Sequence, residues 1–187
     1  MAKKQIIIGV DPGTQVTGYG IVSSTGNQVE LIVVGSIFME KYDDHYDRIS
    51  CIFDRILELI QAYKPDCLAI ESPFYAKNVQ SMLKLGRAQG VAMAAALTHK
   101  LPIFEYAPKA IKQAITGNGN ASKEQVAEML KHILNHKDLP NQLDATDGLA
   151  AAVCHHFKIS HGIHTAGSGK KNSWSNYIKN NPGKISQ

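Results

Sequence analysis

The amino-acid sequence predicts an α/β fold with a mixed five-stranded sheet flanked by helices. Two observations predict it. Short β-rich segments separated by turn signals fill the first 39 residues, and afterwards segments with helical three-and-four spacing of apolar residues alternate with short apolar runs. With 187 residues and 44% hydrophobic content, the chain has the size and the core of one ordinary domain.

The first half of the chain contains four of the five expected strands. Residues 5–10, 17–23 and 28–39 form a meander of hairpins, because Pro-Gly and Thr-Gly-Asn turn sequences separate them. Residues 43–63 have apolar positions every three or four residues and are expected to form an amphipathic helix that Pro65 ends. Residues 67–70 then form a short buried strand that ends at Glu71.

The second half of the chain is expected to be mostly helical. An Ala-rich helix spans about 79–99, a strand spans 102–106, and a short helix with proline in its first turn spans 108–116. A capping box at Ser122 opens the next helix, and a last helix covers about 143–157. The later strands are thus linked by helical crossovers. We expect one domain over 1–159 and a basic, flexible tail over 160–187.

Charge and cysteine content narrow the class of protein. The net charges of residues 1–76, 77–131, 132–157 and 158–187 are −4, +5, −2 and +5, which is typical of a carboxylate cluster beside a cationic surface. Three widely spaced cysteines, no signal peptide and no membrane-spanning run predict a cytoplasmic protein without a membrane segment. A P-loop and a serine nucleophile elbow are absent, and the histidines at 155, 156, 161 and 164 are expected to be solvated rather than zinc ligands.

Four carboxylates are placed where chemistry is expected. Asp11 and Glu71 end two strands, and Asp144 and Asp147 share one face of the last helix. If this helix packs on the sheet, the four acids converge, and their repulsion is relieved by a divalent cation. Oxygen ligands favour Mg²⁺ or Mn²⁺, and two ions roughly 3.5–4 Å apart would activate a water on a phosphodiester. The alternatives are a turn residue at Asp11 and helix-dipole acids at 144 and 147.

A candidate nucleic-acid surface follows Glu71. Phe74 and Tyr75 could stack on an unpaired base, although a core position is an equal alternative for Phe74. The basic residues expected to contact phosphates, each with a solvated helix face as its alternative, are Lys77, Lys84, Arg87, Lys109, Lys112 and Lys123.

Four motifs in this order resemble the bacterial RuvC-type Holliday junction resolvases, which have a ribonuclease-H-like fold. They lie between residues 6 and 156 and read IIIGVDPGTQVTGYGIV, LAIESPFYAKN with LKLGRAQGV, FEYAPKAIKQAITGNGNASKEQV and LDATDGLAAAV. The resemblance implies a metal-dependent homodimer that nicks opposing strands of four-way junction DNA symmetrically and works with the RuvA and RuvB branch-migration proteins. The family's metal-binding acids fall on Asp11, Glu71, Asp144 and Asp147, its base-contacting aromatic on Phe74, its DNA-contacting lysines on Lys112 and Lys123, and its dimerisation helix on 79–99.

Three other functions are weighed against this one. An inactive junction-binding scaffold is disfavoured because all four acids are present. A sugar-kinase or actin-like ATPase needs a second related domain, which 187 residues cannot hold. A ribonuclease-H-like nuclease that acts on structured RNA is the closer alternative.

Overall fold

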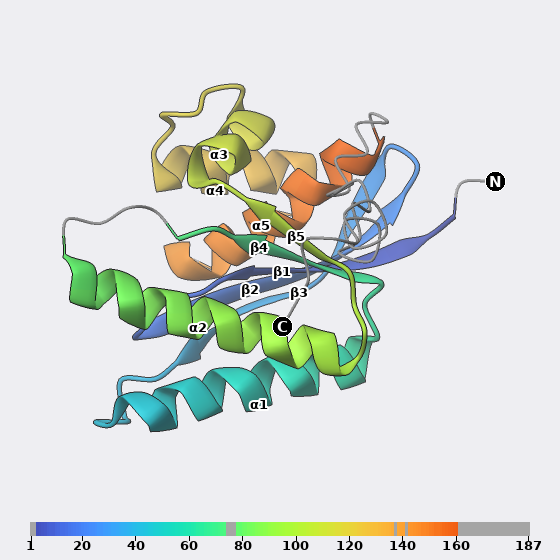
Figure 1. The fold of residues 1–187 in the computed structure, drawn as a ribbon. Coiled ribbons are helices and arrows are strands. Elements are labelled where there is room, and N and C mark those ends of the chain that lie inside the picture. Colours follow the sequence, from blue (N-terminus) through green and yellow to red (C-terminus); the bar gives the residue numbers. More distant parts are fainter. Residues whose placement is uncertain (1–2, 74–77, 137, 141, 161–187) are drawn as a thin grey trace, which may run out of the picture.

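The computed structural model describes residues 3–73, 78–136, 138–140 and 142–160. The elements follow the expected order, and the last helix extends three residues beyond the expected end (Figure 1). In chain order they are β1 (Gln5–Asp11), β2 (Val16–Thr25), β3 (Gln28–Phe38), α1 (His45–Tyr63), β4 (Cys67–Glu71), α2 (Val79–Thr98), β5 (Ile103–Tyr106), α3 (Pro108–Thr116), α4 (Lys123–Ile133) and α5 (Leu143–Ser160).

The sheet is mixed and five-stranded, as the sequence predicts, with the strand order β3-β2-β1-β4-β5. β1, β2 and β3 are antiparallel neighbours, whereas β4 is parallel to both β1 and β5. The expected capping box is confirmed, because the Ser122 hydroxyl accepts from the Gln125 amide and the Gln125 side chain accepts from the Ser122 amide. α1 ends at Tyr63 and is capped by Lys64, whose backbone is left-handed and precedes Pro65.

Helices cover both faces of the sheet (Figure 1). Ile8 and Val10 of β1 point to the face that α1 and α2 cover, where they pack with Ile52 and Ile56. Ile7 points to the opposite face, which α3, α4 and α5 cover. In the described part of the chain, no helix is long and apolar enough to cross a membrane.

The backbone of α5 packs directly against the backbone of β1 and β2. A Cβ atom added at Gly9 would stand 2.3 Å from the Gly148 carbonyl oxygen of α5, and one added at Gly18 would stand 1.7 Å from the Asp144 carbonyl oxygen. Glycines of β1 and β2 therefore give α5 the room to pack closely. The first turn of α5, which carries Asp144, is seated directly on β2.

The expectation that His155 and His156 are solvated is wrong. They are 3% and 1% exposed because α5 is enclosed by the sheet and by α3 and α4. The Tyr106 hydroxyl lies 2.6 Å from His155 Nδ1, and Ser24 Oγ lies 2.7 Å from His156 Nδ1, both within hydrogen-bond distance. Each ring thus has a hydroxyl partner that compensates for its burial. His161 and His164 lie outside the described residues.

Acidification is expected to destabilise the fold through His155. Burial, with a smaller contribution from His156, lowers the pKa of His155 from 6.5 to about 4. The folded state therefore favours the neutral ring. The stability that the neutral His155 contributes is complete above pH 6.5 and is lost as the pH falls toward 4. The loss should reach up to about 3 kcal/mol.

Urea unfolding between pH 4 and 8 measures this effect. His155→Phe leaves the Tyr106 hydroxyl unpaired and should lower stability at neutral pH by about 1–3 kcal/mol. It should nevertheless lose less stability on acidification than the wild type. Parallel pH profiles of the two proteins would contradict the assignment.

Candidate active site

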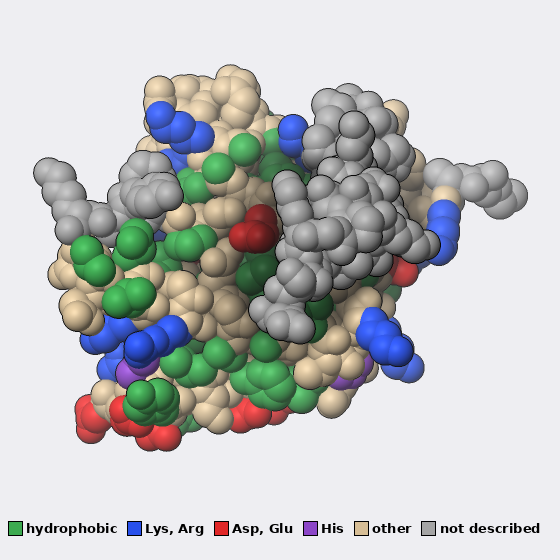
Figure 2. Space-filling view, in the orientation of Figure 1, with side chains coloured by type: hydrophobic (Ala, Val, Ile, Leu, Met, Phe, Trp, Pro, Cys, Tyr) green, Lys and Arg blue, Asp and Glu red, His purple; other side chains and the backbone are tan. Residues whose placement is uncertain are grey.

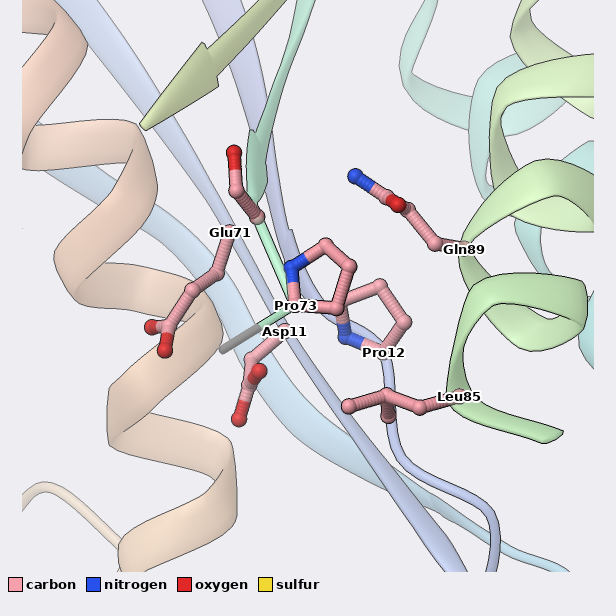
Figure 3. A pocket seen from close by; sticks show the side chains of 7 residues that line it. Asp11, Pro12, Glu71, Pro73, Leu85 and Gln89 are labelled. Atoms are coloured by element: carbon pink, nitrogen blue, oxygen red, sulfur yellow. The ribbon is translucent and has the colours of Figure 1, made fainter. Parts of the chain in front are cut away.

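Asp11 and Glu71 lie side by side at the ends of two parallel strands. The register pairs Val10 with Ile70, so the next residue of each strand is an acid. Both acids point to the face of the sheet that α5 covers, and Figure 3 shows their carboxylates directed toward that helix and away from α2. The expectation that two strands each present one acid at their carboxyl ends is confirmed.

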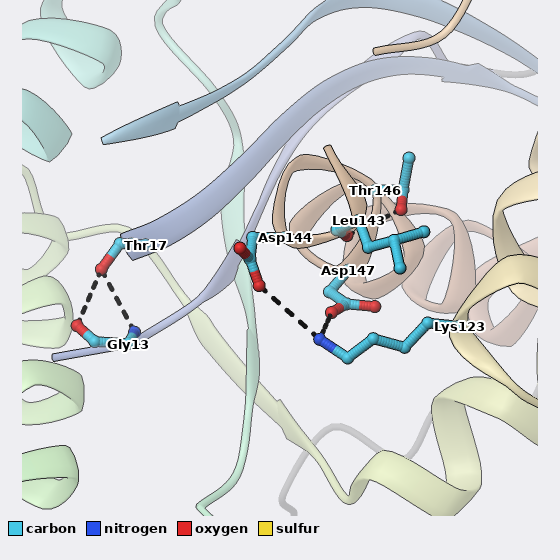
Figure 4. A network of polar contacts seen from close by, with 7 residues as sticks. All are labelled: Gly13, Thr17, Lys123, Leu143, Asp144, Thr146 and Asp147. Atoms are coloured by element: carbon cyan, nitrogen blue, oxygen red, sulfur yellow. Dashed lines mark hydrogen bonds and ion pairs between the residues drawn. The ribbon is translucent and has the colours of Figure 1, made fainter. Parts of the chain in front are cut away.

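The turn after Asp11 is closed by a buried threonine. Gly13 N–H donates to Thr17 Oγ1, and Thr17 Oγ1 donates to the Gly13 carbonyl, both at 3.2 Å (Figure 4). Thr17 is 0% exposed, so these hydrogen bonds are shielded from water. They fix the path of the chain directly after Asp11. The loop thus positions a carboxylate at the strand end.

α5 brings the other two acids to the same end of the sheet. Asp144 lies in its first turn and Asp147 one turn further on, and they share Lys123 as a partner. Lys123 Nζ lies 2.5 Å from Asp147 Oδ2 and 3.6 Å from Asp144 Oδ1 (Figure 4). The side chain of Asp147 is 14% exposed, whereas that of Asp144 is 49% exposed. The ammonium group partly neutralises the cluster.

Two cavities adjoin the acids. One of about 170 Å³ lies between the strand ends, α3, α4 and α5, and Asp11, Glu71, Asp147, Lys112 and Lys123 contribute to its walls. The other, of about 300 Å³, opens toward α2 and is bounded by Pro12, Pro73, Leu85 and Gln89 (Figure 3). Asp11 and Glu71 border both cavities. The acids are therefore accessible from two sides.

The electrostatics of the cluster are those of crowded carboxylates. Burial, followed by the charge of Asp147, raises the pKa of Asp11 to about 7. Burial, followed by the charge of Asp11, raises the pKa of Glu71 to about 8. Burial also raises the pKa of Asp147 against the opposing effect of Lys123. Burial acts to lower the pKa of Lys123, but the hydrogen bond and the charge of Asp147 outweigh it and raise that pKa.

The donor set fits a hard divalent cation. All four acids offer oxygen, which suits Mg²⁺ and Mn²⁺, and a cation would oppose the rise in pKa at Asp11 and Glu71. Within the described residues, however, no group of three or more His, Cys, Asp or Glu side chains stands ready to hold an ion. Lys123 occupies the position beside Asp147 instead. A cation bound among these acids would compete with its ammonium group.

The residues expected to contact DNA form three groups: some lie beside the acids, some lie on α2, and some are outside the described residues. Lys112 and Lys123 line the smaller cavity with Asp11, Glu71 and Asp147. Lys109 is an exposed residue of α3, three positions before Lys112. Lys84 and Arg87 lie on α2, on the other side of the strand ends. Phe74, Tyr75 and Lys77 lie outside the described residues, as does the chain from 161 to 187.

The pairing of Gly18 with Gly148, which allows the close contact between β2 and α5, was not predicted from the sequence. A Cβ at Gly148 would stand 2.5 Å from the Gly18 carbonyl oxygen. The sequence did contain a hint of this contact. A glycine inside a helix is unfavourable without a packing reason, and Gly148 could have been matched with the glycine-rich strand that contains Gly18.

Comparisons with known proteins agree on one family. A family model described as crossover junction endodeoxyribonuclease RuvC matches residues 7–155. The chain is 57% identical over 186 residues to the enzyme of that name from Porphyromonas gingivalis, covering 98% of each. It is 46% identical over 165 residues to that from Haemophilus influenzae, covering 88% of this chain and 86% of the relative.

Solved structures give the same match. Thermus thermophilus RuvC in complex with a Holliday junction substrate superposes with a TM-score of 0.78 at 30% identity. The match covers 84% of this chain and 96% of that one.

Proposed function

The chain belongs to the RuvC family of crossover junction endodeoxyribonucleases, and on this premise we propose that its four clustered acids are the metal-binding catalytic residues. The enzyme resolves Holliday junctions by nicking two opposing strands in recombination and repair, and its chemistry depends on a divalent metal. The RNA alternative receives no support from these relatives. The observation that carries the proposal is the side-by-side placement of Asp11 and Glu71 beneath the first turns of α5.

The proposed cofactor is Mg²⁺, with two ions per site and Mn²⁺ as a substitute. Support comes from the oxygen-only donors and from the raised pKa values of Asp11 and Glu71, which a dication would lower again. When bound, the metal activates a water and stabilises charge on the leaving oxygen. Asp11 and Glu71 would hold it from the sheet, and Asp144 and Asp147 from α5.

The other residues of the site would bind and orient the substrate. Lys112 and Lys123 place two positive charges in the wall of the cavity that contains the acids, where a phosphodiester would enter. Lys123 would exchange its contact with Asp147 for a contact with a phosphate oxygen. Phe74 and Tyr75 would stack on unpaired bases, and Lys77, Lys84, Arg87 and Lys109 would contact the DNA backbone.

The enzyme is proposed to act as a homodimer through α2. Gly86 and Gly90 lie inside this helix, where glycine costs about 1 kcal/mol relative to alanine. A Cβ added at either would meet nothing within 4 Å among the residues that the structure describes. They continue an exposed apolar stripe with Val79, Leu83 and Leu97, which are 61%, 51% and 61% exposed. A partner helix packed against this stripe would explain both glycines.

The double variant Gly86→Ala/Gly90→Ala tests the dimer. The isolated chain should become more stable, because alanine is the better helix former. The dimer should weaken by at least about tenfold in Kd, because the added methyl groups separate the helices. Sedimentation equilibrium measures this, with Ser50→Ala on the exposed side of α1 as control. An unchanged dimer affinity would argue against α2 as the interface.

We propose that the enzyme works with the branch-migration proteins RuvA and RuvB, and family membership supports this proposal. The cytoplasmic location stays a prediction, supported by the three widely spaced cysteines and by the proposed substrate, junction DNA.

The function is tested on synthetic nucleic acids of matched length. With Mg²⁺, the protein should nick a four-way DNA junction at two opposing positions and leave linear duplex DNA and structured RNA intact. EDTA should abolish nicking. Faster cleavage of the structured RNA than of the junction would favour the alternative activity.

A further inference from the structure

A third cavity, lined mainly by polar and charged side chains, lies at the end of the molecule where α1 and α2 begin. It has a volume of about 290 Å³ and is lined by three separate segments. The turn between β1 and β2 contributes Thr14 and Gln15, the first turns of α2 contribute Ser81 and Lys84, and the start of α1 forms the remaining wall. Figure 2 shows a histidine bordered by Lys and Arg side chains over this end of the two helices.

Positive charge exceeds negative charge here, although Asp43 lines the cavity and the charge of Asp44 acts on His45. Arg48 and Lys84 line the cavity, and Arg87 is close enough to act electrostatically on His45 beside them. Within the described part of the chain, none of these three cations forms an ion pair. Asp43 is the one acid in the described wall, and it is exposed. The excess of positive charge around the cavity favours the binding of an anion.

Arg48 is fixed in place. Its Nε donates to the Tyr42 carbonyl at 2.7 Å, and its Nη1 donates to the Thr14 carbonyl at 3.4 Å. These bonds tie α1 to the turn that follows Asp11. A guanidinium oriented in this way loses little entropy when it binds a ligand.

His45 adds a polar atom without a partner. Its Nε2 is shielded from solvent and has no hydrogen-bond partner in the described structure. An unpaired buried nitrogen is unfavourable, and a ligand oxygen or a bridging water would satisfy it. Burial, followed by the charges of Arg87 and Lys84, lowers the pKa of His45.

The cavity and the acid cluster are built from two of the same chain segments. Thr14 follows Asp11 by three residues, and Lys84 precedes Leu85, which borders the cavity of Asp11 and Glu71. Each DNA strand carries one charge per about 3.4 Å of helix rise, so a strand with one phosphate at the acids presents further phosphates along its path, and this cavity would take one of them.

We propose that this cavity, with Arg48, Lys84 and His45, binds a non-scissile backbone phosphate of the junction DNA. The inference rests on the proposed function and adds a second anchoring point for the substrate. Phosphate contacts of this kind set the position of a strand and carry no sequence information. The site would therefore help place the scissile phosphate at the acids.

The test measures binding of a labelled four-way junction in EDTA, where no nicking occurs, at several salt concentrations. Lys84→Gln removes one phosphate contact and should reduce the slope of log K against log salt by about one. At 0.1 M salt the affinity should fall about tenfold. Lys64→Gln, at the opposite end of α1, is the matched control and should keep the wild-type slope.

A scan with single methylphosphonate linkages locates the phosphate. One neutral linkage away from the cut should weaken the wild type but leave Lys84→Gln unaffected. A wild-type slope for Lys84→Gln, or equal losses at every linkage, would overturn this inference while the nicking assay still supports the function. A wild type that neither binds nor nicks the junction would overturn both.

Discussion

Asp11→Asn is expected to lower junction nicking by at least about 1000-fold, equivalent to about 4 kcal/mol of lost transition-state stabilisation. Asp11 borders both cavities at the acid cluster and is the neighbour of Glu71 in the sheet, so any ion held by the strands would contact it. Asparagine keeps the shape of the side chain and removes its charge. Single-turnover cleavage of a synthetic junction with Mg²⁺ measures the effect.

Binding separates lost chemistry from lost substrate affinity. In EDTA, Asp11→Asn should bind the junction at least as tightly as the wild type, because one negative charge that repels phosphate is gone. Asp54→Asn, on the exposed side of α1, removes the same charge and should nick normally. Wild-type nicking by Asp11→Asn would exclude the acid from the mechanism.

Gly18→Ala is the second large expected effect, because it moves α5 relative to the sheet. The new methyl group would stand 1.7 Å from the Asp144 carbonyl oxygen and 2.6 Å from its carbonyl carbon, so the first turn of α5 must shift. We expect the free energy of unfolding to fall by about 1–3 kcal/mol. Nicking should fall about 100-fold, since small displacements of catalytic groups are costly.

A stability control is needed for this variant. Ile56→Ala removes a fully buried side chain on the opposite face of the sheet and should cost about 2–5 kcal/mol. It does not touch α5, so its nicking rate should stay near wild type at a temperature where both variants are folded. Equal nicking by the two variants would show that Gly18 affects stability alone.

The sequence predicted the features that local patterns determine. Strand ends at Asp11 and Glu71 follow from apolar runs bounded by turn residues, and the start of α4 follows from the capping box at Ser122. Asp144 and Asp147 share a face of α5 because they are three residues apart. The prediction that the four acids lie together required the last helix to pack on the sheet. In the structure, α5 does pack on the sheet.

The features that depend on tertiary packing could not be predicted in the same way. The contact between Lys123 and Asp147 joins residues on two helices whose approach no local pattern determines. His155 and His156 are buried because the sheet, α3 and α4 enclose their part of α5, whereas a helix end next to a polar tail is typical of exposure. Likewise, Arg48 and Lys84 line one cavity only because α1 and α2 begin at the same end of the molecule.

Anomalous scattering from crystals soaked in Mn²⁺ would locate the metal among the four acids. We expect a peak within about 2.5 Å of carboxylate oxygens of both Asp11 and Glu71, with Asp144 or Asp147 at the same cluster and Lys123 displaced from Asp147. A second peak about 3.5–4 Å away would support two ions. Mn²⁺ bound elsewhere, with Lys123 still seated on Asp147, would contradict the assignment of these acids.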